Sequence, residues 1–329
     1  MPTRNPQLAT RSPQITILDG YVANPNDLSW DSIARLGNLT IYDRTNDADL
    51  FARAKDANIL ITNKRRINRE LIYQLDKLKC ICLLSTGYNS VDIEAAKERG
   101  VTVCNAVGYS GSSVAQHVFA LLLELTNNVG LHNQSVQKKE WATSRDWCYW
   151  KSPIMELADK TMGVYGLGKI GQVVAKIALA FGMQVMATRK NLNKPNPLNI
   201  PIVPFEKLLS QSDVLSLHAP LSEENYRIIN HKTLSQMKPN AILINTGRGD
   251  LVNEEDLKYA LQNKIIAAAG LDVLSQEPPP LTHPLFDLPN CIITPHNAWV
   301  SKESRARLIQ IVADNIAAFL AGTPQNVVV

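Results

Sequence analysis

The sequence predicts an α/β fold with two doubly wound parallel sheets, one in each of two domains. Three observations support this prediction. Short apolar runs alternate with helical patterns along most of the 329 residues, which is typical of parallel sheets with helices on both faces. One of these runs leads into a glycine-rich turn and then into a helix. Polar residues follow several other runs, at the strand ends where such sheets bind ligands.

The composition is ordinary for a globular protein, with 45% hydrophobic and 19% charged residues. The net charge of +4 is small and scattered, so it indicates neither a nucleic acid nor a membrane as partner. No apolar run approaches a membrane span, and the N-terminus lacks the apolar region of a signal peptide. The five cysteines have no zinc-ligand spacing, so we expect no metal, and Cys80 and Cys82 are expected to be buried thiols. These features favour a cytoplasmic protein.

The first domain is expected at residues 15–110. Residues 1–14 contain three prolines and few apolar residues, which favours a flexible N-terminal extension. The expected strands of this domain are Ile15–Leu18, Leu39–Tyr42, Asn58–Thr62, Cys80–Leu84 and Val101–Cys104. Helices fit between them, for example at Asn68–Leu75 and Asp92–Arg99.

The C-terminal segment has helical spacing from Ser301 to Leu320. We expect this helix to return to the first domain, which therefore also takes residues 300–329. No fold element is expected beyond about Gly322.

The second domain is expected at residues 111–299 and opens with an apolar helix, Ser113–Thr126. Apolar residues nearly all round this helix suggest burial between domains or subunits. The segment Trp141–Trp150 contains three tryptophans and a tyrosine, which favours a packing or dimer surface over a ligand cage.

The stretch from Thr161 to Lys190 contains the glycine-rich turn. An apolar strand leads into Gly166, Gly168 and Gly171, spaced as GxGxxG, and a helix and a second strand follow. This arrangement is the dinucleotide-binding fingerprint of the Rossmann fold. The first glycine permits the tight turn, the second lets the backbone approach a pyrophosphate, and the third lets helix and strand pack closely. Helix N-terminal amides would then bind the phosphates.

Four further strands of the second domain are expected to end in polar residues at one edge of the sheet. These strands are Asp213–His218, Ala241–Asn245, Ile265–Val273 and Cys291–Thr294.

Three ionisable residues near these strand ends could carry chemistry: Arg248, Glu277 and His296. Arg248 lies between two glycines and offers a planar fork to a carboxylate. His296 is suited to proton transfer near neutral pH, and Glu277 precedes three prolines that could fix its carboxylate beside the imidazole. The pattern alone leaves alternatives, because His218 and His283 compete with His296, and Glu277 could be a solvated loop charge.

The combination of GLGKIG, NTGRGDLVNE, LDVLSQEP and TPHNAW resembles the D-isomer-specific 2-hydroxyacid dehydrogenase family. The match covers nearly the whole chain from Ile15 onward, and the order of the signatures also matches. DGYVANPNDLSW, STGYNSVDIEAAKERGVTVCN and SVAQHVFALLLELTNNVGLHNQSV look like the glycerate dehydrogenase (hydroxypyruvate reductase) branch. The resemblance implies a flavodoxin-like substrate domain and a Rossmann cofactor domain with a cleft between them.

The resemblance also implies roles for particular residues. Arg248 matches the arginine that holds the substrate carboxylate, His296 the acid/base, and Glu277 its acidic partner. The Thr86-Gly87 step matches a loop whose amides receive the carboxylate. Further positions that match the cofactor site are Lys169, Ile170, Thr188, His218, Ala219, Pro220, Thr246, Asp272 and His296. A homodimer built largely through the second domain is implied as well.

The expected activity is reduction of hydroxypyruvate or glyoxylate to D-glycerate or glycolate by hydride transfer from NAD(P)H to C2. Two alternatives are a non-enzymatic, NAD(H)-sensing scaffold, because PHNAW also resembles the C-terminal-binding-protein corepressors, and a formate dehydrogenase relative. Formate dehydrogenases have a glutamine where this chain has Glu277, which argues against that chemistry.

The chain departs from the NAD-specific members of the family at the end of the second Rossmann strand. Those members carry an acidic residue there for the ribose hydroxyls, whereas this strand ends in Thr188-Arg189-Lys190. A guanidinium favours a 2′-phosphate, so NADPH is expected as the preferred cofactor.

Overall fold

The computed structural model describes residues 12–193 and 195–329. The chain forms two compact units, of which the first runs to Ser110 and resumes at Val300, and the second spans Gly111–Trp299. Most of the expected N-terminal extension, residues 1–11, lies outside the described residues. Its expected end at Gln14 is wrong by one residue, because Gln14 is the first residue of a strand and pairs with Asn38.

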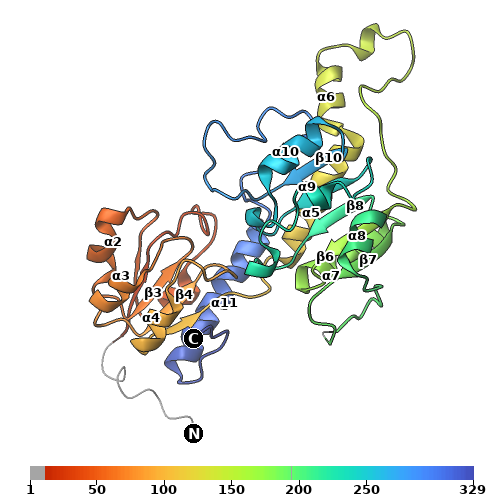
Figure 1. Ribbon diagram of the computed structural model, residues 1–329. Coiled ribbons are helices and arrows are strands. Elements are labelled where there is room, and N and C mark those ends of the chain that lie inside the picture. The colour runs from red at the N-terminus through yellow and green to blue at the C-terminus, as the bar shows by residue number, and fades with distance from the viewer. Residues whose placement is uncertain (1–11, 194) are drawn as a thin grey trace. The chain divides into compact units, whose positions relative to one another are not determined.

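The first unit contains a five-stranded, all-parallel sheet in the order β2-β1-β3-β4-β5 (Figure 1). The strands are β1 (Gln14–Ile17), β2 (Asn38–Ile41), β3 (Ile59–Thr62), β4 (Cys80–Leu83) and β5 (Thr102–Cys104). This is the flavodoxin-like strand order. The five strands predicted from apolar runs are confirmed to within one residue at each end.

The helices of the first unit are α1 (Asp31–Ala34), α2 (Asp47–Ala54), α3 (Arg69–Gln74), α4 (Ile93–Glu98) and α11 (Lys302–Leu320). Asn46, Asn68 and Asp92 start α2, α3 and α4, since each side chain accepts a hydrogen bond from a first-turn amide. The apolar sides of α3 and α4 share a core with β3, β4 and β5, whereas α11 packs against α1 and β4.

The last residues of the chain extend the same sheet, so the expectation of no fold element beyond Gly322 is wrong. The amide of Val328 donates to the carbonyl of Val103 at 2.8 Å, and Val103 donates to Val329 at 2.8 Å. Cys104 and Val327 form an antiparallel bridge. Strand β5 is the last parallel strand, and its outer backbone groups need partners that this tail supplies.

The second unit contains a six-stranded, all-parallel sheet in the order β11-β10-β9-β8-β6-β7 (Figure 1). The strands are β6 (Thr161–Tyr165), β7 (Gln184–Thr188), β8 (Val214–Leu217), β9 (Ile242–Asn245), β10 (Ala268–Leu271) and β11 (Cys291–Ile293). Beyond β7, Ile202 forms one parallel bridge with Ala187. Counted from β6 with this bridge as the third strand, the order is that of the Rossmann fold.

Helices cover both faces of this second sheet. They are α5 (Gly111–Asn127), α6 (Val129–Gln137), α7 (Lys169–Ala180), α8 (Phe205–Gln211), α9 (His231–Leu234) and α10 (Glu254–Gln262), with short 3₁₀ turns η2 (Trp141–Thr143), η3 (Glu223–Asn225) and η4 (Gly249–Leu251). In β9, Ile242 and Ile244 share a core with α5 and α7, and Leu243 shares a core with α8, α9 and α10. This alternation follows from the two-residue period of a strand.

The apolar residues of helix α5 are explained by packing within the second unit. It packs against α7, β9 and β10, and buries Val118, Leu121 and Leu122. Gly270 of β10 permits this approach, because a Cβ there would lie 3.1 Å from the Cβ of Leu121. The expected burial between domains or subunits is therefore not needed to explain the helix.

The tryptophan-rich segment lies away from this core. Trp141, Trp147 and Trp150 are 52%, 86% and 70% exposed. In Figure 1, α6 and the segment after it lead away from the six-stranded sheet. The segment therefore offers an apolar surface instead of filling the interior of the unit.

The five cysteines are free thiols, and the prediction that Cys80 and Cys82 are buried is confirmed. Over residues 12–193 and 195–329, no His, Cys, Asp or Glu cluster is placed to bind a metal ion. Over the same ranges, the longest helices are too short or too polar to cross a membrane.

Candidate active site

A glycine turn joins β6 to α7. Gly166 has a φ of +99°, and a Cβ there would lie 2.5 Å from the amide nitrogen of Ala219. A Cβ on Gly171 would overlap the carbonyl oxygen of Gly166. At Gly168, the N-cap of α7, a Cβ would meet nothing within 4 Å. The turn is therefore tightly packed on two sides and open at the helix N-terminus, where a pyrophosphate can meet free amides.

Two buried polar atoms around this turn have no hydrogen-bond partner among the described residues. They are Oγ1 of Thr246, directly after β9, and Nε of Arg189, directly after β7. Buried polar groups are normally paired, so each of these atoms is available to a bound ligand. Together with the open space at Gly168, they fit a bound nicotinamide dinucleotide.

The end of β7 carries two cations with different surroundings. Nη1 and Nη2 of Arg189 donate to the carbonyls of Pro195 and Leu192 at 3.2 and 3.1 Å. Lys190 is paired with Glu224 of η3, with Nζ–Oε distances of 2.7 and 2.6 Å. Lys190 is therefore engaged in an exposed ion pair, whereas the Arg189 guanidinium is fixed in place by neutral carbonyls.

His218 follows β8 and is held in its neutral form. Its Nε2 lies 2.8 Å from Oγ of Ser216, and burial lowers the pKa of His218 to about 4. A histidine with this pKa is deprotonated near neutral pH and cannot supply a proton there. The structure thus weakens the case for His218 as an alternative acid.

His296 and Glu277 form the acid pair suggested by the sequence. Nδ1 of His296 lies 2.6 Å from Oε2 of Glu277, and both side chains are partly exposed, at 27% and 32%. Because an ionised carboxylate only accepts hydrogen bonds, Nδ1 carries the proton and Nε2 is the nitrogen left for a reactant. The amide of Leu274 donates to Oε1 of Glu277 at 3.2 Å and orients the carboxylate.

The loop that carries His296 is held by Asp272, a carboxylate only 1% exposed. Its Oδ1 accepts from Oγ1 of Thr294 at 2.7 Å and from the amide of Asn297 at 2.9 Å. Its Oδ2 accepts from the amide of Ala298 at 2.9 Å. The sequence predicts that Asp272 lines the cofactor site. In the structure its carboxylate accepts three hydrogen bonds from the loop that carries His296.

The loop that carries Glu277 is held by Glu254, the first residue of α10. Glu254 accepts from the amide and hydroxyl of Ser275 at 2.8 and 2.6 Å. It also lies 3.2 Å from Nε2 of His283, a histidine that is 5% exposed. His283, the other alternative acid, is therefore engaged in fixing this loop. Sequence reasoning does not identify Glu254, because its partners come from a distant segment.

Arg248 follows β9 and has an exposed side chain, with Nη1 donating to the carbonyl of Gly247 at 2.7 Å. Asn245 fixes this loop, since its Nδ2 donates to the Arg248 carbonyl at 2.8 Å. A Cβ on Gly249 would overlap the backbone of Leu274 and Ser275. The Arg248 loop therefore packs directly against the Glu277 loop.

Thr86 and Gly87 lie after β4, in the first unit. Oγ1 of Thr86 donates to the carbonyl of Ala106 at 2.7 Å, and its carbonyl accepts from Nδ2 of Asn105 at 2.7 Å. The carbonyl of Gly87 accepts from Oγ of Ser85 at 2.6 Å. These bonds fix the shape of the loop.

The structure thus brings most of the predicted site residues to one edge of the second sheet. The acid pair and the Arg248 loop follow β9, β10 and β11. The glycine turn follows β6, Ala219 and Pro220 follow β8, and Thr188 is the last residue of β7. Lys169 and Ile170 begin α7 beside them. Parallel strands end at the same edge, which explains why segments so far apart in sequence meet.

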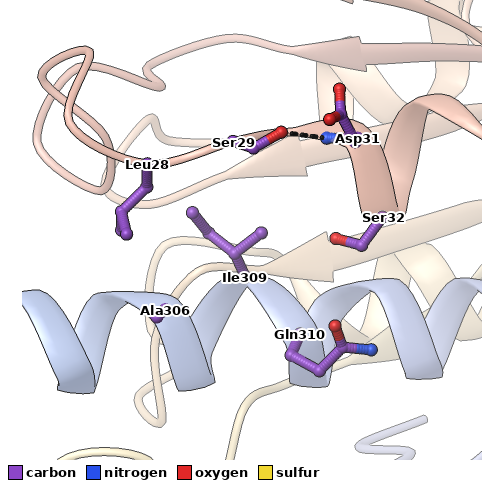
Figure 2. A pocket seen from close by; sticks show the side chains of 7 residues that line it. All are labelled: Leu28, Ser29, Asp31, Ser32, Ala306, Ile309 and Gln310. Atoms are coloured by element: carbon purple, nitrogen blue, oxygen red, sulfur yellow. Dashed lines mark hydrogen bonds between the residues drawn. The ribbon is translucent and has the colours of Figure 1, made fainter.

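A separate cavity of about 270 Å³ lies between α1 and α11 of the first unit (Figure 2). It is lined by Leu28, Ser29, Asp31, Ser32, Ala306, Ile309 and Gln310. None of the predicted site residues lines it, so the cavity is not part of the candidate active site.

Comparison with known proteins agrees with this geometry. The family described as D-isomer specific 2-hydroxyacid dehydrogenase, NAD binding domain, matches residues 119–298. A hydroxypyruvate reductase of Blautia hydrogenotrophica is 45% identical over 320 residues, which are 96% of this chain and 99% of the relative. A glycerate dehydrogenase of Methylorubrum extorquens is 40% identical over 85% of this chain and 88% of its own. The solved structure of an acyclic imino acid reductase in complex with NADPH and D-Arg has a TM-score of 0.84 and 33% identity, covering 96% of this chain and 100% of that one.

Proposed function

The chain belongs to the D-isomer-specific 2-hydroxyacid dehydrogenases, and we propose that it reduces hydroxypyruvate or glyoxylate to D-glycerate or glycolate with NADPH as preferred cofactor. The family makes it an oxidoreductase acting on CH–OH groups. The single observation that carries the proposal is the 2.6 Å contact between His296 and Glu277 at the strand edge that also holds the glycine turn. The choice of substrate rests on the 45% identity to a hydroxypyruvate reductase.

Each residue of the site has a proposed part in the reduction. Arg248 anchors the substrate carboxylate through its planar fork. His296 holds a proton at Nε2 and gives it to the alkoxide that develops at C2. The negative charge of Glu277 favours the imidazolium form of His296. The nicotinamide cofactor, when bound, supplies the hydride.

The preference for NADPH rests on Arg189. The end of β7 has no carboxylate to accept bonds from the ribose hydroxyls, and the guanidinium of Arg189 retains a buried Nε without a partner among the described residues. Lys190 contributes less to this preference, because its ammonium group is directed to Glu224. Backbone contacts from Gly166, Gly168 and Gly171 would serve NADH and NADPH equally.

We also propose that the enzyme is a cytoplasmic homodimer. Exposed apolar residues on and after α6, among them Val129, Trp147 and Trp150, form a surface of the kind that protein interfaces bury. Sedimentation equilibrium of the wild type and of a Trp147→Ala variant tests the dimer. A wild-type monomer at micromolar concentration would contradict it.

The experiment that tests the proposed function is a substrate panel. The absorbance of the reduced nicotinamide is followed in each assay. NADH and NADPH are tested with hydroxypyruvate, glyoxylate, pyruvate, and the 2-oxo acid of arginine mixed with ammonia. Formate is tested with the oxidised cofactors. The proposal expects the highest kcat/KM for hydroxypyruvate or glyoxylate with NADPH. Activity with none of them would favour the non-enzymatic scaffold, and turnover of formate alone would favour the formate dehydrogenase alternative.

A further inference from the structure

His296 adopts a backbone conformation that a histidine does not prefer. Its φ is +52°, in the left-handed region, which residues other than glycine seldom adopt. Such a conformation persists only where the surroundings hold it. The contacts that hold this loop therefore determine where the imidazole lies.

Asp272 binds the loop on both sides of His296. Its carboxylate accepts from Thr294, two residues before the histidine, and from the amides of Asn297 and Ala298 directly after it. The amide of His296 itself donates to the carbonyl of Thr294 at 2.9 Å. The residues before and after His296 are thus both bound to the buried carboxylate of Asp272.

Helix α5 supports this arrangement from outside. Nε2 of His117 lies 2.9 Å from Oγ1 of Thr294 and 3.5 Å from Oδ1 of Asp272. One turn earlier, Oγ of Ser113 donates to the carbonyl of Ala298 at 2.6 Å. The helix therefore contacts both ends of the segment that contains His296.

The direction of the hydrogen bonds follows from counting protons. A threonine hydroxyl has one proton, and an ionised carboxylate can only accept, so Thr294 donates to Asp272. The same hydroxyl must then accept from His117, which places a proton on Nε2 of His117. His117 is thus the outermost donor of a chain that runs through Thr294 to Asp272. Without that donor, Thr294 is free to turn away from the carboxylate.

We infer that His117 is a positioning residue for His296: its Nε2–H fixes Thr294 on Asp272 and so keeps the acid in its left-handed conformation beside Glu277. The inference rests on the proposed role of His296. A displacement of about 1 Å at a reacting group can cost roughly 10²-fold in rate. Loss of His117 should therefore lower kcat through the position of His296.

The test compares three variants of the full-length enzyme. His117→Phe keeps a ring and removes the donor, and His117→Gln keeps an N–H at similar reach. His231→Phe, on the exposed start of α9, is the matched control. We expect His117→Phe to lower kcat by about 10- to 100-fold with KM changed by less than about threefold, and to move the basic limb of the kcat profile to lower pH. His117→Gln should recover most of both, and His231→Phe should behave as wild type.

Two further measurements test the role of His117. In a His296→Ala background, His117→Phe should leave the residual kcat unchanged, because there is no acid left to position; a further loss would overturn the inference. Amide hydrogen exchange at Asn297 and Ala298 should be faster in His117→Phe at unchanged global stability. Wild-type exchange together with wild-type kcat would also overturn it. If His296→Ala were fully active, the proposed role of His296 as the acid would fail, and the exchange rates alone would decide whether His117 holds the loop.

Discussion

Nδ1 of His296 lies 2.6 Å from Oε2 of Glu277, although the two residues are 19 positions apart in the chain. They meet because their loops leave neighbouring parallel strands, β10 and β11, whose register pairs Leu271 with Ile293. A histidine with a carboxylate on one ring nitrogen keeps a defined tautomer. The proposed proton transfer depends on this pair.

Glu277→Gln tests the electrostatic part of the pair. The amide can still bond to the ring but has no charge to favour the imidazolium. We expect the basic limb of the kcat profile for oxo-acid reduction to move to lower pH, with little change in cofactor binding. A limb that stays at the wild-type pH would show that the carboxylate does not act on the acid through its charge.

Arg248→Lys tests the carboxylate anchor. Lysine retains the positive charge but lacks the planar pair of donors, so it holds a carboxylate less firmly. Loss of a charge-assisted bond corresponds to about 1.5–3 kcal/mol, which is roughly ten- to a hundredfold in kcat/KM. Initial rates over a range of oxo-acid concentration measure this. Unchanged KM and kcat would show that Arg248 is not the carboxylate anchor.

Arg189→Asp tests cofactor choice. The wild type should prefer NADPH over NADH by about ten- to a hundredfold in kcat/KM, because the guanidinium can form a charge-assisted bond with the 2′-phosphate. The aspartate would repel that phosphate and accept bonds from ribose hydroxyls, so the preference should vanish or reverse. Lys190→Asn is the control and should change the preference much less, since Lys190 is already paired with Glu224. Equal or better use of NADH by the wild type would rule out the role given to Arg189.

The lowered pKa of His218 predicts a loss of stability at acid pH. Its pKa is about 4 in the folded protein, against about 6.5 when unfolded, so the unfolded chain binds the extra proton between these values. Its contribution to stability is present above pH 6.5 and is lost as the pH falls towards 4, by an amount of the order of 2–3 kcal/mol.

Urea unfolding of the wild type and His218→Asn at several pH values measures this loss. Asparagine can still bond to Ser216 and does not titrate, so the variant should lose less stability between pH 6.5 and 4. His231→Asn, which removes an exposed histidine, should follow the wild type. Identical pH dependence in all three proteins would show that His218 is not held neutral by burial.

Most of the fold could be predicted because buried parallel strands leave a local signal. Ile59–Thr62 is a fully buried apolar run, and the polar residues around it mark its ends. Ile202 could not be recognised as a strand, because only a single bridge to Ala187 defines it. The pairing of the C-terminal residues with β5 could not be predicted from the sequence either. It depends on the free edge of β5, which exists only after the sheet has formed.

Some residues of the candidate site could be predicted from the sequence, and others could not. Arg248, Glu277 and His296 could be found because each follows a strand in a characteristic motif. His117 and Glu254 could not, because their partners, Thr294 and Ser275, become neighbours only in the folded chain. Asp272 was recognised as a site residue, but its hold on the His296 loop could not be deduced from its position in sequence.

The most direct test of the account is the kcat of His296→Ala for hydroxypyruvate reduction, measured beside NADPH binding by quenching of protein fluorescence. General acid–base groups typically contribute about 10²–10⁴-fold. The account predicts a fall of this size in kcat with cofactor affinity close to that of the wild type, because the glycine turn and Arg189 are untouched. A folded variant that binds NADPH and retains the wild-type kcat would contradict it.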